Sequence, residues 1–257
     1  MTGQNLFAGK KCLVTGAGRG IGRAIVGELH SQGAIVYALS KNPETLQALK
    51  EDFPKIIPIC ANLLNWEEAK ETIESIEAVD CLINNAGIYE PHKFLSLTME
   101  SYDEHFNVNL KAVVLVSQIV ARKMIEGGKG GSIVNMSSIA SQRAIPDCSI
   151  YCCTKAALDM LTKTMALELG AHQIRVNSVN PAGVMTDMTR SSDWNNSKTN
   201  GSMKVKEVEQ LLIRRTPTET LWMPMRDVVN TTLFLASNQT SQITGQCVAV
   251  DGGFLAN

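Results

Sequence analysis

The chain has no long apolar run and no marked excess of charge of either sign. Its 257 residues contain no stretch of about 18 uninterrupted apolar residues, and residues 1–5 are polar, so we expect neither a membrane-spanning helix nor a signal peptide. The formal net charge is −1, which provides no broad basic surface for nucleic acid or for an anionic membrane. We therefore expect no nucleic-acid partner and no stable insertion into a membrane.

Histidine is scarce, and neither histidine nor cysteine shows a disulfide or metal-binding pattern. The seven cysteines are an odd number without the spacing of a disulfide framework, which indicates a reducing compartment, so we expect a cytoplasmic protein. The four histidines are scattered, and we expect no metal site. The cysteines that lie in or beside predicted strands, and that we expect to be buried, are Cys12, Cys60, Cys81 and Cys247.

Short apolar segments alternate with amphipathic segments along the whole chain. Hydrophobic residues make up 44% of the sequence and charged residues 19%, the balance of a globular protein with a large core. Apolar runs predict strands at residues 10–15, 35–39, 56–60, 81–84, 132–136, 175–179 and 247–250. Helical periodicity predicts helices at residues 21–32, 44–51, 66–76, 99–126, 150–169 and 226–235. Because strands separated by helices form parallel sheets covered on both faces, we predict one doubly wound α/β domain of the Rossmann type over residues 1–257.

A glycine-rich turn joins the first predicted strand to the first predicted helix. It comprises residues 15–22, with glycine at positions 16, 18, 20 and 22. Backbone N–H groups in such a turn can approach a pyrophosphate at the helix N-terminus, where the helix dipole also favours an anion. The turn therefore predicts a dinucleotide site, and a merely tight turn is the alternative interpretation.

A tyrosine and a lysine stand four residues apart in the predicted helix 150–169. Positions i and i+4 share a helix face, so Tyr151 and Lys155 can point into one pocket, with Ser138 at the end of the preceding strand. A free tyrosine has a pKa of about 10, and a nearby cation would lower it toward the neutral range that proton transfer needs. The pair indicates proton transfer at an oxygen, and the glycine turn indicates a hydride from a nicotinamide. An exposed pair with a packed ring and a solvated ammonium is the alternative.

Together these motifs resemble those of the short-chain dehydrogenases/reductases. The resemblance covers nearly the whole chain and rests, in order, on the glycine turn, residues 84–87 (NNAG), Asn109, Ser138, Tyr151, Lys155 and residues 180–183 (NPAG). Only about seventy residues follow Gly183, which favours the compact oxidoreductases of the family over the extended members. Further segments are similar to the tetrameric carbonyl reductases that act on dicarbonyls and L-xylulose: residues 116–122, 141–144, 158–163, 165–170 and 252–254.

The resemblance implies a role for each of four residues. Tyr151 would be the general acid in carbonyl reduction, and Lys155 would lower the pKa of Tyr151 and hold the nicotinamide ribose. Ser138 would hydrogen-bond the substrate carbonyl. Asn109 would support a water that relays protons to Lys155, and a buried asparagine satisfied by backbone groups is the alternative.

Charge predicts which cofactor is used. NAD-binding chains usually carry an acidic residue at the end of the second strand, whereas this chain has Ser40 and Lys41 there and no carboxylate before Glu44. With Arg19 as a second cation, the site would suit a 2′-phosphate, so we predict NADP(H), with surface solvation as the alternative for either cation alone. The residues expected to bind the cofactor are Gly16, Arg19, Gly20, Ile21, Gly22, Ser40, Lys41, Asn62, Leu63, Asn85, Ala86, Gly87, Tyr151, Lys155, Pro181, Val184 and Thr186.

Three positions depart from the carbonyl reductase pattern. Asn62 stands where an aspartate is expected to contact the adenine, and its amide oxygen can still accept a hydrogen bond. Ile139 and Cys148 replace a glutamine and a histidine of the enzymes that reduce L-xylulose, which makes the pocket less polar. Residues 186–202, rich in Ser, Asn and Thr, are interpreted either as a flap over the cleft or as a solvated loop. The residues expected to contact substrate are Ser138, Ile139, Cys148, Tyr151 and Trp194.

The sequence thus predicts an NADPH-dependent reductase of a small-molecule carbonyl substrate. Small α-dicarbonyls such as diacetyl are the expected substrates, and L-xylulose is a further candidate. The alternatives are a reductase of another ketone (a steroid, a retinoid or a 3-oxoacyl thioester) and a non-catalytic NADP-binding regulator. The helix around residues 113–121 is apolar nearly all round, so a second covering surface is expected, and the resemblance implies a homotetramer.

Overall fold

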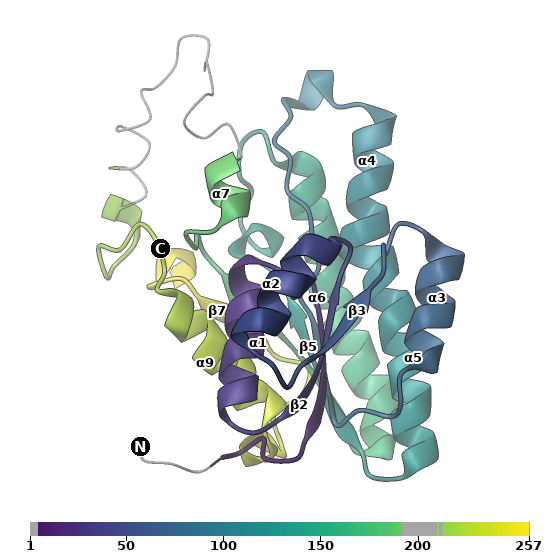
Figure 1. Cartoon of the computed structure of the whole chain (residues 1–257). Coiled ribbons are helices and arrows are strands. Elements are labelled where there is room, and N and C mark those ends of the chain that lie inside the picture. The colour runs from purple at the N-terminus through teal and green to yellow at the C-terminus, as the bar shows by residue number, and fades with distance from the viewer. Residues whose placement is uncertain (1–4, 192–209, 211–212, 257) are drawn as a thin grey trace.

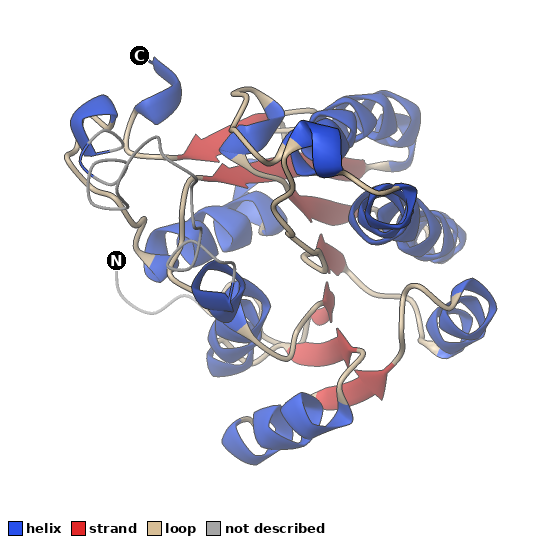
Figure 2. Ribbon diagram, turned by 90° about the horizontal axis from the view of Figure 1, so that it is seen from above, coloured by secondary structure: helices blue, strands red, loops and turns tan. Residues whose placement is uncertain are grey.

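The computed structural model describes residues 5–191, 210 and 213–256. It contains a seven-stranded parallel sheet in the order β3-β2-β1-β4-β5-β6-β7, with helices on both faces (Figures 1 and 2). The strands are β1 Lys11–Thr15, β2 Ile35–Ser40, β3 Ile57–Cys60, β4 Cys81–Asn84, β5 Gly131–Met136, β6 Ile174–Pro181 and β7 Cys247–Val250. The helices are α1 Gly20–Ser31, α2 Pro43–Asp52, α3 Trp66–Ser75, α4 Met99–Phe106, α5 Ala112–Gly127, α6 Ser149–Leu169, α7 Asp187–Ser191 and α9 Met225–Ala236. The predicted doubly wound α/β fold is confirmed.

Two apolar clusters cover the two faces of the sheet. Successive residues of a strand point to opposite faces, so Val14 of β1 belongs to one cluster and Leu13 to the other. The cluster of Val14 takes in apolar side chains of α1, α2 and α9, and the cluster of Leu13 takes in those of α3, α5 and α6. Both faces are therefore buried, as parallel sheets require.

The strand order reverses direction next to β1, which lies between β2 and β4. At such a switch point the loops after the two central strands diverge and leave a crevice at the carboxyl edge of the sheet. Hydrogen bonds join the two loops: Thr15 Oγ1 accepts from the backbone N–H groups of Asn85 and Ala86, both at 3.0 Å. The Asn85 amide donates to the carbonyl oxygens of Thr15 and Gly16, each at 3.1 Å. The glycine turn is thus held at the base of the crevice.

The predicted helix 99–126 is divided into three parts. The helix α4 ends at Phe106, a π-helical turn spans Asn107–Lys111, and α5 begins at Ala112. Apolar periodicity gives no sign of this turn, because the change from i+4 to i+5 hydrogen bonding affects only five residues. Such turns within helices frequently occur at functional sites.

The expected burial of α5 on two sides is confirmed, and the second covering surface comes from the same chain. Val116, Ile119 and Val120 are buried in the cluster that includes α3, so this helix gives no evidence of another subunit. The expected burial of two cysteines is wrong. Cys60 is exposed because it lies in β3, at the edge of the sheet, and Cys247 is half-buried. All seven cysteines are free thiols. None of the described helices combines the length and apolarity that crossing a membrane would require.

Candidate active site

A cleft of about 1090 Å³ opens at the carboxyl edge of the sheet, over the switch point. The predicted site residues that line it are Gly16, Arg19, Gly20, Ile21, Ser40, Lys41, Asn62, Leu63, Asn85, Ala86, Gly87, Ser138, Ile139, Cys148, Tyr151, Lys155, Pro181, Val184 and Thr186. Gly22 and Asn109 do not line it. Trp194, with residues 192–202 of the expected flap, lies outside the described residues, whereas part of the remainder forms α7.

The glycine turn leaves no room for a Cβ at three of its glycines, Gly16, Gly18 and Gly22. A Cβ at Gly22 would lie 2.2 Å from the carbonyl oxygen of Gly16, and one at Gly18 would lie 2.2 Å from Thr45 Oγ1. Gly16 and Gly20 have φ values of 64° and 56°, a conformation that glycine adopts without strain. The helix α1 begins at Gly20, so its N-terminus faces the cleft. This turn fits the pyrophosphate of a dinucleotide.

The end of β2 carries one cation, Lys41, and several polar groups. Ser40, Lys41, Asn42 and Thr45 line the cleft after β2, and none of these four residues is acidic. Lys41 and Arg19 are both exposed on the same cleft, where a phosphate could reach them. Thr45 is a lining residue that the sequence prediction missed, since only the fold brings α2 against the glycine turn.

Tyr151 and Ser138 meet in the middle of the cleft. Burial raises the pKa of Tyr151 to about 12, although a hydrogen bond with Ser138 opposes the shift. Lys155 Nζ lies 5.5 Å from the centre of the tyrosine ring and donates to the carbonyl oxygen of Met136 at 2.8 Å. Desolvation is the largest cause of the raised pKa of Tyr151, and an effect of Lys155 on that pKa stays a prediction.

Lys155 itself is buried, with 5% of its surface exposed. Burial lowers its pKa to about 8, and the negative charge of Asp159 opposes this shift. The ammonium lies beside Gly87: a Cβ at that glycine would be 3.8 Å from Lys155 Nζ and 3.3 Å from Asn109 Oδ1. The space beside Gly87 is therefore bordered by both the lysine and the asparagine.

Asn109 is fully buried in the π-helical turn, where its amide bonds backbone groups. Its Oδ1 accepts from the N–H of Ile88 at 2.8 Å, and its Nδ2 donates to the Ile88 carbonyl at 3.0 Å and to Thr154 Oγ1 at 3.3 Å. These bonds match the alternative interpretation, an asparagine satisfied by backbone. They also fix the chain directly after residues 84–87.

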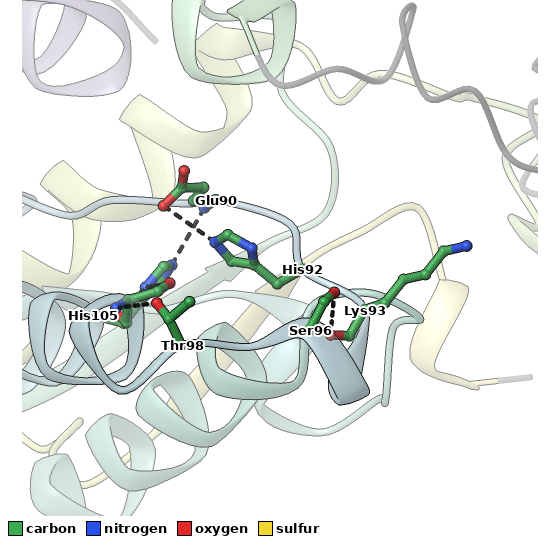
Figure 3. Close-up of polar contacts among 7 residues, drawn as sticks. Glu90, His92, Lys93, Ser96, Thr98 and His105 are labelled. Atoms are coloured by element: carbon green, nitrogen blue, oxygen red, sulfur yellow. Dashed lines mark hydrogen bonds and ion pairs between the residues drawn. The ribbon is translucent and has the colours of Figure 1, made fainter.

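A second buried side chain fixes the same loop two residues later (Figure 3). His105 of α4 is 1% exposed, and its Nδ1 lies 2.7 Å from the Ser101 carbonyl oxygen while its Nε2 lies 3.2 Å from the backbone N of Glu90. Since a carbonyl can only accept and an N–H can only donate, the proton is on Nδ1 and the ring is neutral. Glu90 Oε2 lies 3.2 Å from His92 Nε2.

A buried polar network supports the turn that carries Ser138. Asn180 Nδ2 donates to Asp159 Oδ2 at 2.7 Å, to Ser141 Oγ at 2.9 Å and to the Ser138 carbonyl at 3.3 Å. Asp159 also accepts from Ser178 Oγ at 3.1 Å. The Asp159 carboxylate of α6 thus holds Asn180 and Ser178 of β6, and Asn180 in turn holds the backbone of Ser138. This network fixes the position of Ser138 relative to α6, the helix that carries Tyr151.

Several cleft residues were not predicted. The most prominent are Tyr89, Leu221, Trp222, Met223 and Phe254. For the segment 221–223, the sequence offers one indication of a cleft position: Trp222 is a large apolar side chain outside any periodic helix or strand pattern. Among the described residues, no three His, Cys, Asp or Glu side chains gather as a metal ion would require.

Comparisons with known proteins identify the class of this site. The family model for short chain dehydrogenases matches residues 10–197. The chain is 47% identical to the L-xylulose reductase of Mus musculus over 97% of this chain and 98% of that protein, and 45% identical to carbonyl reductase (NADPH) 2 of Sus scrofa over 98% of each. A gluconate 5-dehydrogenase from Burkholderia cenocepacia, solved in complex with NADP and tartrate, is 28% identical with a TM-score of 0.88 and 98% coverage of both chains.

Proposed function

The chain belongs to the short-chain dehydrogenase family and is an oxidoreductase, and from that premise we propose that it is an NADPH-dependent reductase of small carbonyl compounds. The observation that carries the proposal is the cleft in which Ser138, Tyr151 and Lys155 lie opposite the glycine turn. The carbonyl reductase (NADPH) and L-xylulose reductase relatives support the reaction type. Small α-dicarbonyls such as diacetyl are the proposed substrates, with L-xylulose as a further candidate.

The cofactor site has two ends, one for the phosphate groups and one for the nicotinamide. Gly16 and Gly20, with the N-terminus of α1, would hold the pyrophosphate, and Arg19 with Lys41 would bind a 2′-phosphate. Lys155 would hold the nicotinamide ribose. When bound, NADPH supplies the hydride.

The proton is supplied by the chain itself. Ser138 donates a hydrogen bond to the substrate carbonyl oxygen and stabilises the charge that develops there. Burial raises the pKa of Tyr151 to about 12, so the phenol holds its proton at neutral pH, and the positive charge of Lys155 would bring its pKa back toward the operating range. Tyr151 then transfers its proton to the same oxygen, and the buried Lys155 provides the neighbouring positive charge. Asn109 holds the Ile88 backbone behind these groups.

A substrate panel tests this function. Purified protein is mixed with NADPH or NADH and with diacetyl, L-xylulose, a steroid ketone or an acetoacetyl thioester, and the loss of reduced-cofactor absorbance is followed. We expect NADPH oxidation with diacetyl. Activity with only the steroid or the thioester would favour another ketone reductase. Binding of NADPH without turnover of any carbonyl would favour a regulator.

We further propose, from the likeness to tetrameric carbonyl reductases, that the protein is a cytoplasmic homotetramer. The exposed apolar residues Met160 (60%) and Leu167 (83%) of α6 support an additional contact surface. They lie seven residues apart, on one face of the helix.

A further inference from the structure

Tyr89 lies directly beside the proposed general acid. Its ring meets that of Tyr151 edge-on, with centroids 5.2 Å apart and an interplanar angle of 81°. Its hydroxyl is hydrogen-bonded to Cys148 Sγ at 3.3 Å. Both Tyr89 and Cys148 line the cleft, and Tyr89 takes no part in the proton transfer proposed for Tyr151.

The backbone on both sides of Tyr89 is fixed by buried side chains. Asn109 bonds both backbone groups of Ile88, and His105 accepts from the N–H of Glu90. Three residues after Tyr89, the N–H of His92 donates to the Asp147 carbonyl at 2.7 Å, next to Cys148. The backbone around Tyr89 is therefore held in place and the Cys148 bond restrains its side chain, so little conformational entropy is lost when a substrate packs against the ring.

The surface that Tyr89 presents near Tyr151 is apolar. Ile139 and Cys148 are 8% and 3% exposed, and together with Tyr89 they form what we call the apolar wall. The hydroxyl of Tyr89 is already bonded within the wall, and burial raises its pKa, so it stays neutral. Of the charged residues that line the cleft near the wall, Lys93, Glu104 and Asp147 are exposed, and Arg143 is half-buried with its guanidinium carbon 5.7 Å from the centre of the Phe254 ring.

We propose that Tyr89 is a specificity-determining residue, and that the apolar wall selects carbonyl substrates with an aryl or alkyl substituent over polyhydroxylated ketones. The inference rests on the proposed carbonyl reductase activity and names its substrate class. A hydroxylated substituent packed on this wall would lose hydrogen bonds to water without replacing them, whereas an apolar one gains contact area. The ketone oxygen itself still meets Ser138 and Tyr151.

The test compares one apolar and one polyhydroxylated ketone. The ratio of kcat/KM for 1-phenyl-1,2-propanedione to kcat/KM for L-xylulose is measured with NADPH for the wild type and for variants. We expect the wild type to favour the aryl diketone, and Tyr89→Ala to lower the ratio by about tenfold or more, the range for loss of apolar pocket contacts. Tyr89→Phe keeps the ring and should change the ratio by less than about threefold.

Two further variants make the outcome decisive. Cys148→Ser replaces the thiol of the wall with a hydroxyl of similar size and should lower the ratio through better L-xylulose turnover, independently of any folding defect in Tyr89→Ala. Tyr102→Ala removes an aromatic residue of α4 that does not line the cleft and should leave the ratio unchanged. Titration with NADPH checks that each variant is folded.

The possible failures can be told apart. A wild type that reduces both ketones but favours L-xylulose, or a ratio that is unchanged in both Tyr89→Ala and Cys148→Ser, overturns the role of the wall and leaves the carbonyl reductase activity standing. A wild type that binds NADPH and reduces neither ketone overturns both proposals.

Discussion

At the scale of single residues, burial shifts the pKa of both ionisable groups of the proposed catalytic pair. The pKa of Tyr151 is raised to about 12 and that of Lys155 is lowered to about 8, in each case chiefly by desolvation. Both shifts favour the neutral form of the group. The phenol therefore holds its proton at neutral pH, whereas the lysine is close to losing its charge.

The lowered pKa of Lys155 predicts a pH limb in the reduction rate. As pH rises through about 8 the ammonium loses its proton, so its positive charge beside Tyr151 is lost and kcat/KM for diacetyl reduction should fall. Tyr151, with a pKa of about 12, contributes no change in this window. The measurement is a pH profile of kcat/KM with NADPH for the wild type and Lys155→Met. A wild-type profile that is flat through pH 8, or the same limb in Lys155→Met, would contradict this assignment.

Arg19 and Lys41 predict the preference for the phosphorylated cofactor. Removing the cations in an Arg19→Ala/Lys41→Asp double variant should lower kcat/KM for NADPH by about tenfold or more, since each charge-assisted hydrogen bond to a phosphate contributes roughly 1.5–3 kcal/mol. The efficiency with NADH should not fall. The control is Lys70→Ala, which removes an exposed lysine of α3 outside the cleft and should leave both efficiencies unchanged. A wild type that prefers NADH would refute the NADP(H) proposal.

At the scale of elements, the sequence predicted what depends on local pattern. All seven strands were found within two residues of their expected bounds because their apolar runs are short and separated by periodic helices. The π-helical turn and α7 were missed, since neither changes the apolar pattern. Cys60 was misjudged because only the strand order shows that β3 is an edge strand.

In the site, too, the sequence predicted what local motifs carry and missed what only the fold brings together. The motifs predicted that Ser138, Tyr151 and Lys155 would meet, and they do. The place of Tyr89 in the cleft could not be predicted, because Cys148 is 59 residues away in sequence and only the fold brings it and Tyr151 beside Tyr89.

The close packing of the glycine turn predicts a contrast between two glycines. In Gly22→Ala the new Cβ would lie 2.2 Å from a backbone oxygen, so the turn must shift, and NADPH affinity should fall at least about tenfold with a loss of stability of order 1–3 kcal/mol. In Gly127→Ala at the end of α5 the Cβ meets nothing within 4 Å, and both quantities should be unchanged or slightly improved. Fluorescence titration with NADPH and urea unfolding measure the two effects. Equal behaviour of the two variants would show that the turn does not depend on this glycine.

At the scale of the whole molecule, the parallel sheet places every proposed catalytic group at one edge. The glycine turn follows β1, Asn85 follows β4, Ser138 follows β5 and Pro181 ends β6, so strands far apart in sequence contribute to one cleft. The opposite ends of the strands carry none of the predicted site residues. Helix α6 begins at this edge and carries Tyr151 and Lys155 in its first two turns.

The proposed tetramer is tested at the same scale. Sedimentation of the wild type should give four times the mass of the 27.9 kDa chain. Leu167→Glu places a charge on the exposed apolar face of α6 and should shift the protein toward smaller species. Leu95→Glu, at a 98% exposed leucine outside that helix, is the matched control. A wild-type monomer at micromolar concentration would refute the tetramer.

The most direct measurement is NADPH oxidation with diacetyl by the wild type and by Tyr151→Phe, together with NADPH affinity for both. The phenylalanine keeps the ring and its packing against Tyr89 but has no proton to give. We predict that the wild type reduces diacetyl, that Tyr151→Phe loses about 10²–10⁴-fold in kcat, and that both bind NADPH with similar affinity. Equal turnover by the two proteins, or NADPH binding without turnover by either, would contradict carbonyl reduction with Tyr151 as the acid.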